Sequence, residues 1–237
     1  MLSDACRNES PAERLVPLKR KVRDDTLLVH EIYASVQGES THAGRPCAFV
    51  RTTTCHLRCT YCDTAHAFHA GAELELEEVM RRVAALGLPL VELTGGEPLL
   101  QPSALRLVER LLDAGFEVLI ETSGAVTIAG VDRRAKLIVD IKTPGSGEDG
   151  RNVWANLPRL RPGHDEVKVV ITSEADYAWA RAELSRRAVP DGVTVLFSPA
   201  APLLAPAVLA SWIVRDCLPV RFQVQLHKVL WGDRPGV

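Results

Sequence analysis

Residues 89–114 read PLVELTGGEPLLQPSALRLVERLLDA, and they contain a strand, a turn and a helix in succession. Residues 89–94 form an almost continuous apolar run, which is typical of a strand buried on both faces of a parallel sheet. Pro102 suits the first turn of a helix, and Gly115 directly follows the helix predicted at 102–114. This order of strand and helix indicates an α/β fold.

The same rhythm recurs from about residue 27 to the end of the chain. Further strands are predicted at 28–34, 46–52, 116–121, 136–141, 166–172, 193–197 and 220–226, and further helices at 75–86, 174–188 and 206–217. Repeated units of this kind build either an open doubly wound sheet or a barrel, and the pattern does not decide between them. Both architectures bind ligands at the carboxyl ends of their strands.

Five segments follow predicted strands and are therefore expected to meet at one site. They are residues 51–54 with the cysteine-rich run behind them, TGGEP at 94–98, ETSG at 121–124, DIKTPGSG at 140–147 and FSP at 197–199. The most turn-rich stretch, residues 143–152, is expected to be a mobile loop.

Length and charge favour a single globular domain that acts on a small molecule. The 237 residues suffice for one core, which we assign to residues 27–237, with residues 1–26 as a flexible extension. A formal net charge of −2 provides no basic field for nucleic acid or an anionic membrane. No apolar run approaches the roughly 20 residues of a membrane span.

The cysteines indicate a metal site and not a disulfide framework. Cys55, Cys59 and Cys62 share the run CHLRCTYC, whereas the other three cysteines are scattered. Reduced thiols in the cytoplasm fit this distribution.

Three thiolates at this spacing could hold a four-iron, four-sulfur cluster and leave one iron without a protein ligand. An open metal position is a property of reactive centres. Zinc remains an alternative on this run alone, because His56, His66 or His69 could complete a tetrahedral Cys3His site.

The run TGGEP adds a feature that structural zinc does not explain. Gly95 and Gly96 at a strand end allow close approach of the backbone to a ligand, and Glu97 could accept hydrogen bonds from an ammonium group.

The pairing of CxxxCx(aromatic)C with a GGEP at a strand end resembles the radical S-adenosylmethionine (SAM) superfamily, which implies a partial (βα)6-type barrel, a [4Fe-4S] cluster and SAM as cofactor. Outside these motifs, residues 28–237 resemble the 7-carboxy-7-deazaguanine synthase family in SVQGE (35–39), GRP (44–46), Arg51, CDT (62–64), ETSG (121–124), DIKTP (140–144), SP (198–199) and LHK (226–228). The resemblance implies a carbon–nitrogen lyase of queuosine biosynthesis. Its reaction converts 6-carboxy-5,6,7,8-tetrahydropterin to 7-carboxy-7-deazaguanine by ring contraction with loss of ammonia.

Site residues follow from the same resemblance, position by position. Cys55, Cys59 and Cys62 would hold the cluster and Thr64 would bind Mg2+. SAM would contact Tyr61, Cys62, Asp63, Gly96, Glu97, Ser123, Asp140, Ile141, Lys142, Ser198 and Pro199. The pterin would contact Val36, Gln37, Gly38, Glu39, Arg51, Thr94 and His227. No side chain is assigned as a general acid or base.

Some expectations follow from the residues beside the resemblance. Asp140 and Lys142 are two apart on a predicted strand, so they should point to the same face. A guanidinium such as that of Arg51 presents a planar fork of donors to a carboxylate. The family usually has QGEG where this chain has Ser40 as the fourth residue, and this departure changes no ligand.

Two other functions remain open at this point, and the resemblance also implies partners. A glycyl-radical-activating enzyme shares both cysteine and glycine motifs, but the QGE and LHK segments argue against it. A zinc-stabilised binding module without catalysis would need only the three cysteines and one of the histidines His56, His66 and His69. The expected partners are a reductant protein such as flavodoxin or ferredoxin and a second copy of the chain in a homodimer.

Overall fold

The structure is a computed structural model that describes residues 23–187, 189–232, 234 and 236. Residues 1–22, which make up most of the predicted extension and include Cys6, lie outside the described residues. The first strand begins at Thr26, one residue before the predicted start of the core domain. The five described cysteines are all free thiols, as predicted.

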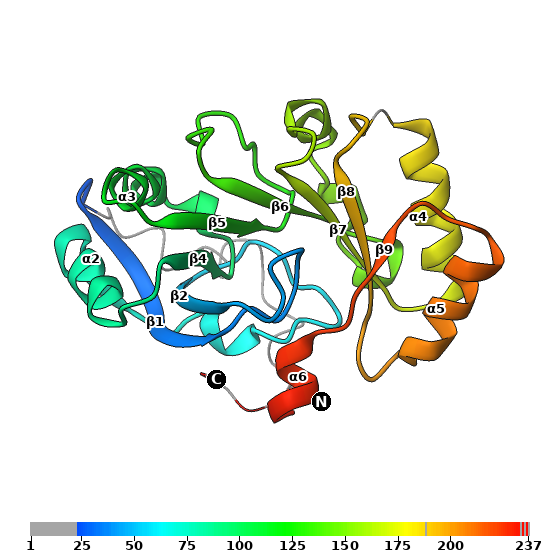
Figure 1. Cartoon of the computed structure of the whole chain (residues 1–237), viewed down its shortest axis with the longest axis horizontal. Helices are drawn as coiled ribbons and strands as arrows, with labels where there is room; N and C mark the ends of the chain where they lie inside the picture. The colour runs from blue at the N-terminus through cyan, green and yellow to red at the C-terminus, as the bar shows by residue number, and fades with distance from the viewer. Residues whose placement is uncertain (1–22, 188, 233, 235, 237) are drawn as a thin grey trace.

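One curved sheet of nine strands forms the centre of the molecule (Figure 1). Its spatial order is β3-β1-β2-β4-β5-β6-β7-β8-β9. The two end strands, β3 and β9, each pair with a single neighbour, so the described strands form an open, partial barrel. The strands are β1 (Thr26–Val36), β2 (Pro46–Thr52), β3 (Ala72–Glu75), β4 (Leu90–Gly95), β5 (Glu117–Thr122), β6 (Lys136–Ile141), β7 (Glu166–Ile171), β8 (Thr194–Pro199) and β9 (Arg221–Phe222).

From β2 onward the pairs β2–β4 to β8–β9 are parallel, as their apolar runs predicted. β1 departs from this pattern because it runs antiparallel to both β2 and β3. The turn at residues 37–45 joins β1 directly to β2, and a connection this short permits only an antiparallel pair. β1 is buried over its first four residues, whereas the rest of the strand is only partly buried or exposed.

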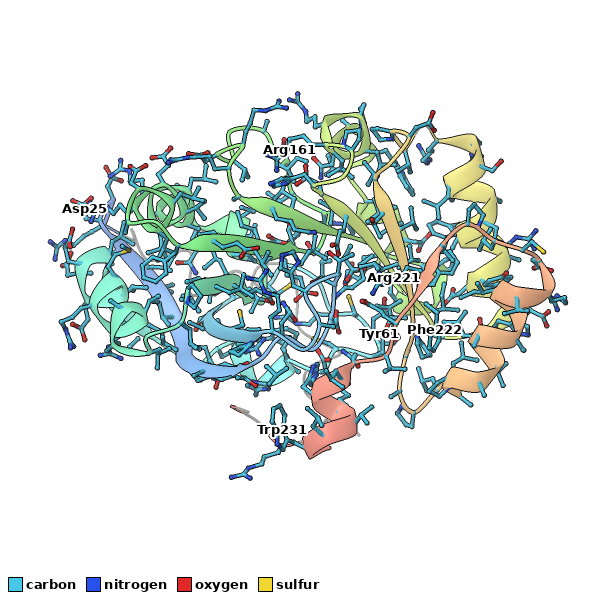
Figure 2. All side chains as sticks on the ribbon, in the orientation of Figure 1. Asp25, Tyr61, Arg161, Arg221, Phe222 and Trp231 are labelled. Carbon is cyan, nitrogen blue, oxygen red and sulfur yellow. The ribbon has the colours of Figure 1, made fainter. Side chains whose placement is uncertain are left out.

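The helices lie on the outside of the curved sheet, except for the last one, which lies near the opening between its two ends (Figure 1). The apolar sides of the outer helices and the sheet share one continuous core that includes Leu107, Val139 and Phe197. Trp231 at the end of the last helix projects away from the sheet (Figure 2). The helices are α2 (Leu76–Ala85), α3 (Pro102–Asp113), α4 (Glu174–Arg186), α5 (Pro206–Arg215) and α6 (Leu226–Trp231).

The predicted start of α4 is confirmed, because the Ser173 side chain caps the helix by accepting a hydrogen bond from the Asp176 amide. Three predictions were wrong. β3 was missed, the strand predicted at 220–226 contains only two strand residues followed by α6, and α6 itself was missed. Within the described part of the chain, no helix has the length and apolar character that a membrane crossing needs.

Candidate active site

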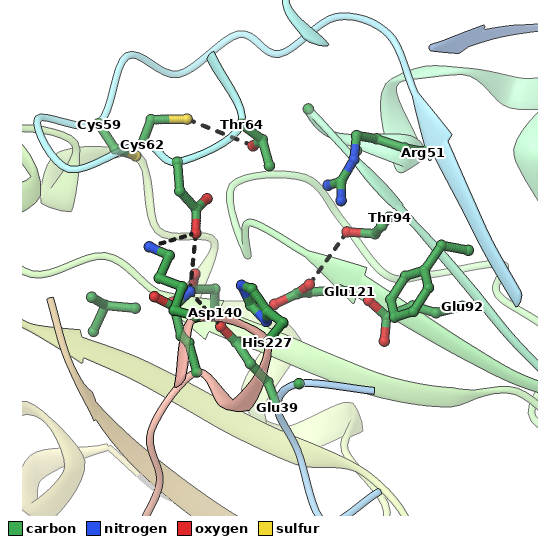
Figure 3. Close-up of a pocket in the computed structure, with 18 of the residues that line it drawn as sticks. Glu39, Arg51, Cys59, Cys62, Thr64, Glu92, Thr94, Glu121, Asp140 and His227 are labelled. Atoms are coloured by element: carbon green, nitrogen blue, oxygen red, sulfur yellow. Dashed lines mark hydrogen bonds and ion pairs between the residues drawn. The ribbon is translucent and has the colours of Figure 1, made fainter. Parts of the chain in front are cut away.

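A pocket opens at the carboxyl ends of the strands, where the five predicted segments were expected to meet. Figure 3 shows Cys59, Cys62 and Thr64 on one side of it and Arg51 on the other. Of the predicted site residues, those that line the pocket are Val36, Gln37, Gly38, Glu39, Arg51, Cys55, Cys59, Tyr61, Cys62, Asp63, Thr64, Thr94, Gly96, Ser123, Asp140, Lys142 and His227.

The three cysteines lie in an apolar setting formed with Leu57 and Phe68. Burial raises the pKa of Cys55 to about 12 and that of Cys59 to about 11. Thiols in such surroundings stay protonated unless a cation stabilises the thiolate. The donor set therefore fits an iron–sulfur cluster, whose irons supply that positive charge.

The glycine pair permits the cysteine loop to lie directly against β4. A Cβ on Gly96 would overlap the Thr54 carbonyl and lie 2.9 Å from the Cβ of Cys55. The Gly96 amide donates to the Thr52 carbonyl over 3.2 Å and the Glu97 amide to that of Thr54 over 2.8 Å. Thr54 itself has a φ of +87°, a strained conformation for a β-branched residue. The close approach predicted for the glycines is thus made to the cysteine loop.

Residues 143–152 support the cysteine loop from the other side. They form short 3-10 helices at Pro144–Ser146 and Asp149–Arg151, and the predicted mobility of this segment stays a prediction. The Thr60 hydroxyl donates to the Gly145 carbonyl over 2.6 Å, and the Thr60 amide donates to that of Ser146 over 3.0 Å. Asp176 of α4 anchors the segment by accepting from the Gly145 amide over 2.8 Å. The turn-forming residues here therefore hydrogen-bond both to the cysteine loop and to α4.

The side of the pocket nearest the cysteines has polar atoms without partners. Nζ of Lys142 lies 2.6 Å from Oδ2 of Asp140, which confirms that these side chains share a face. Oδ1 of Asp140 and the hydroxyl of Tyr61 are buried and have no hydrogen-bond partner among the described residues. Unpaired buried polar atoms are costly, so a ligand with complementary groups fits here. SAM, with its ribose hydroxyls and adenine nitrogens, meets that requirement.

Glu97 does not line the pocket, and the ligand contact predicted for its carboxylate stays a prediction. The side chain is fully buried and accepts from the Leu99 amide, the Thr122 hydroxyl, and both the amide and the hydroxyl of Ser123. Burial raises the pKa of Glu97, and the hydrogen bonds from Ser123 and its neighbours counteract that shift. Glu97 therefore holds Ser123, which does reach the pocket.

Three more residues predicted to contact SAM lie behind the pocket wall. Ile141 packs in the main apolar core, and Ser198 and Pro199 are buried without lining the pocket. The chain reaches the pocket directly after Pro199, at Ala200 and Ala201. β8 continues to Pro199, so the wall begins only after the strand has ended.

Arg51 is held by two side chains of β1. Its Nε lies 2.7 Å from Oε1 of Glu31, and its Nη2 donates to the Tyr33 hydroxyl over 2.8 Å. Tyr33 in turn stacks on Phe49, with the ring centroids 5.2 Å apart. These contacts use one edge of the guanidinium and leave Nη1 for a ligand carboxylate on the pocket side.

The QGE segment is tied down by its own hydrogen bonds. Oε1 of Gln37 accepts from the Glu39 amide over 2.9 Å, and its Nε2 donates to the Glu92 carboxylate. The Gly38 carbonyl accepts from the Leu226 amide over 2.8 Å, and a Cβ on Gly38 would overlap the ring of His227. The glycine thus allows α6 to pack on this segment. Burial lowers the pKa of His227, which favours the neutral ring.

A cluster of charged side chains forms the floor of the pocket (Figure 3). Nζ of Lys168 lies 2.6 Å from Oε2 of Glu39 and also pairs with Glu121, whose other oxygen accepts from the Thr94 hydroxyl over 3.2 Å. Burial opposes the charged amine, but Glu121 and Glu39 outweigh it and raise the pKa of Lys168 well above its usual value. Burial, together with the neighbouring Glu121, raises the pKa of Glu92 and favours its protonated form.

α6 closes part of the pocket mouth through polar contacts to the residue after the last cysteine. Asp63 accepts from Nε2 of Gln225 over 3.0 Å and lies 3.3 Å from Nζ of Lys228. Gln225 also donates to Glu39 over 2.7 Å. The cysteine loop, the QGE segment and the carboxyl-terminal helix therefore meet at this point.

Several pocket residues were missed from the sequence, namely Glu31, Tyr33, Glu92, Lys168, Gln225 and Lys228. A signal was present for some of them. Side chains two apart on a strand share a face, so Glu92 could have been inferred from Thr94. Glu31 pairs with Arg51 across the strands β1 and β2, so it could have been inferred from Arg51 once this pairing was known. Lys168 offered the plainest signal, because a lone lysine in an apolar strand needs a buried partner.

Comparison with known proteins agrees with this geometry. A sequence model of the radical SAM superfamily matches residues 49–144. The chain is 44% identical over 214 residues to the 7-carboxy-7-deazaguanine synthase of Chlorobaculum tepidum, covering 89% of this chain and 97% of the relative. It is 43% identical to the synthase of the same name from Koribacter versatilis, covering 86% of this chain and 96% of that one. The chain belongs to the 7-carboxy-7-deazaguanine synthase family.

A solved structure supports the fold of this synthase family member. The crystal structure of QueE from Escherichia coli superposes with a TM-score of 0.72 at 21% sequence identity, over 85% of this chain and 95% of that one. Membership of the synthase family makes the chain a radical SAM enzyme, and a [4Fe-4S] cluster and SAM are the cofactors of that superfamily. The alternative of a non-catalytic zinc module is thereby set aside.

Proposed function

We propose that this chain converts 6-carboxy-5,6,7,8-tetrahydropterin to 7-carboxy-7-deazaguanine, contracting the ring with loss of ammonia, as a step of queuosine biosynthesis. The observation that carries the proposal is the shared pocket. It brings three cysteines, of which Cys55 is buried, together with the Arg51 guanidinium and two polar atoms that have no partner among the described residues. Full-length relatives with the synthase name support the same reaction.

The cofactors, when bound, supply the hydrogen-abstracting 5′-deoxyadenosyl radical, so the protein has to position the substrate and exclude water. Cys55, Cys59 and Cys62 would hold the cluster. Asp140 and Tyr61 would hydrogen-bond SAM through the atoms that lack partners in the protein.

Arg51 would bind the carboxylate of the pterin. Glu31 and Tyr33 fix its orientation, so little side-chain entropy remains to be lost when the carboxylate arrives. The stacked Tyr33 and Phe49 rings line the pocket beside it and offer an apolar surface for the pterin ring.

Thr64 would contribute one ligand to Mg2+. Its hydroxyl lies 3.7 Å from Sγ of Cys62 and lines the pocket. A single neutral oxygen suits Mg2+ only if water and substrate oxygens complete the octahedron, and the carboxylate expected at Arg51 could provide one.

The remaining proposals concern partners. A flavodoxin or ferredoxin would supply the electron, and the enzyme would work in the cytoplasm as a homodimer. The exposed apolar side chains of Val229 and Leu230 on α6 support an interface on that surface. Sedimentation of the purified chain tests the dimer.

Anaerobic turnover tests the reaction itself. The reconstituted protein is incubated with 6-carboxytetrahydropterin, SAM, a reductant and Mg2+, and the products are identified by mass spectrometry. The expected product has lost ammonia relative to the substrate and is absent with a Cys59→Ala variant. Cleavage of SAM without that product would refute the assigned substrate. Installation of a glycyl radical on a second protein would favour the activating enzyme instead.

A further inference from the structure

A second group of metal-binding side chains lies beside the pocket, outside the cysteine loop. His30, Glu31 and His66 each offer one ligand atom, and these atoms all lie within 4.8 Å of one another. His30 and Glu31 come from β1, whereas His66 lies in the 3-10 helix Ala65–Ala67 that follows the cysteines. Segments far apart in the sequence therefore converge here.

A β-bulge explains how adjacent residues of one strand contribute to the same group. In a regular strand the side chains of His30 and Glu31 would point to opposite faces. The pairing of β1 with β2 shifts register between Val29 and Glu31, so His30 is the extra residue. A bulge re-aims a side chain, and here it lets both residues approach His66.

The ring of His30 is oriented as metal-binding imidazoles usually are. Its Nδ1 lies 2.6 Å from the carbonyl oxygen of Ala70, and that carbonyl is also held by the Thr53 hydroxyl at 2.7 Å. Donation from Nδ1 to a fixed carbonyl selects the tautomer in which Nε2 carries a lone pair. The two imidazole rings lie 5.1 Å apart between centroids.

Glu31 can serve both Arg51 and a metal ion. Oε1 accepts from Nε of Arg51 and lies 4.0 Å from Nε2 of His66. Among the residues that the structure describes, Oε2 of Glu31 takes no hydrogen bond. A carboxylate can bridge a guanidinium and a cation through its two oxygens, which reduces the repulsion between the two positive groups.

We infer that His30, Glu31 and His66 form a binding site for a divalent transition-metal ion at the edge of the pocket. Two imidazoles and one carboxylate are the ligands of zinc and similar borderline cations, and they disfavour Mg2+, which prefers oxygen. Three protein ligands leave a further coordination position for water. Because Glu31 and His66 line the pocket, that position is open to solvent. The inference does not depend on the proposed reaction.

Zinc uptake by the cluster-loaded enzyme tests the site. The holoenzyme is dialysed to equilibrium against Zn2+ with Mg2+ in excess, and zinc and iron per chain are measured by mass spectrometry. We expect one zinc per chain with the iron content unchanged. The variants His30→Gln and His66→Asn should each weaken binding at least about tenfold, since even indirect supports of metal ligands are worth that much. His164→Gln, at a histidine paired with Asp165, is the matched control and should bind like the wild type.

Several outcomes would overturn the inference. They are absence of zinc uptake, equal uptake by all four proteins, displacement of zinc by excess Mg2+, or uptake that occurs only as iron is lost. The last result would mean that zinc replaces the cluster at the cysteines. Iron content also reports folding, so a variant that fails to fold is recognised, and the second variant then decides.

Discussion

Gly96 and Cys55 are packed so closely that a Cβ on the glycine would lie 2.9 Å from the Cβ of the cysteine. The two residues belong to different segments, one following β4 and the other following β2. Thr54, in its strained backbone conformation, separates β2 from the cysteine. The position of Cys55, the first of the proposed cluster ligands, is thus set by the backbone of the neighbouring strand end, with no side chain between the two residues.

Gly96→Ala tests this relationship. The added methyl group meets backbone atoms of Thr54, which cannot rotate away, so the cysteine loop should shift. We expect a loss of stability of about 1–3 kcal/mol, as for other overpacked sites, together with lower iron content after reconstitution. Iron per chain and the thermal unfolding midpoint are the measurements.

Gly150→Ala provides the matched control, because a Cβ at Gly150 meets no atom within 4 Å. It should reconstitute and unfold like the wild type. Equal iron content in the Gly96→Ala and control proteins would show that the loop tolerates the displacement.

Glu97→Gln tests whether the carboxylate positions Ser123. All the groups around Glu97 donate hydrogen bonds, and a glutamine would turn an NH2 group toward some of them. The loss of stability should be about 1–3 kcal/mol, the range for a buried group left without a partner. Because Ser123 lines the pocket, the dissociation constant for SAM should rise as well, which equilibrium binding would measure.

The exposed Glu109→Gln on α3 is the control for the same chemical change. If Glu97→Gln lost stability but bound SAM as tightly as the control, Glu97 would be a core residue without a positioning role.

The grouping of the proposed cluster cysteines was predictable from the sequence because these residues are local. Cys55, Cys59 and Cys62 occur within eight residues, and the glycine pair stands at the end of an unmistakable buried strand. The side-chain partners of Glu97 could not be predicted in this way. Ser123 lies 26 residues later, directly after the neighbouring strand β5, and only the register of β4 with β5 brings the two together.

The direction of β1 and the existence of β3 and α6 were not predictable for a related reason. An apolar run indicates that a strand is buried, but it does not indicate whether the neighbouring strand runs parallel or antiparallel to it. β3 reads Ala-Glu-Leu-Glu and lies at the edge of the sheet, with little burial to mark it. α6 is six residues long, has no side-chain cap and buries no residue fully, so its position depends on contacts with Asp63 and Gly38.

Asp165 should make stability fall in acid. Its side chain is fully buried and accepts from the Leu137 amide over 3.0 Å and from Nε of Arg161 over 2.8 Å. Burial favours the neutral acid, but Arg161 and the backbone donors outweigh it and lower the pKa of Asp165. A lowered pKa stabilises the fold at pH values above the unfolded pKa, near 4, and this contribution is lost as the pH falls below that value.

Unfolding by urea between pH 6 and pH 3 measures this dependence. Asp165→Asn should be less stable than the wild type near pH 6 by about 3 kcal/mol or more, since it leaves Arg161 without its buried partner. Between pH 5 and pH 3 the free energy of unfolding of this variant should change less than that of the wild type. Asp191→Asn, at an exposed position, should keep the wild-type slope, and an unchanged slope in Asp165→Asn would assign the acid sensitivity elsewhere.

Lys168 should be essential for the stability of the fold because it neutralises the carboxylates on the pocket floor. Removing its charge in Lys168→Met leaves Glu39 and Glu121 close together without a cation. Breaking a buried ion pair on one side costs about 3–5 kcal/mol, which corresponds to a fall of roughly 10 °C in the unfolding midpoint for a chain of this size.

The double variant Lys168→Met, Glu121→Gln distinguishes charge from packing. Removing one carboxylate relieves the repulsion, so the double variant should recover a large part of the lost midpoint. If the double variant were as unstable as the sum of its single changes, the lysine would act through the volume of its side chain. Differential scanning calorimetry of the wild type, both single variants and the double variant under anaerobic conditions supplies the complete thermodynamic cycle.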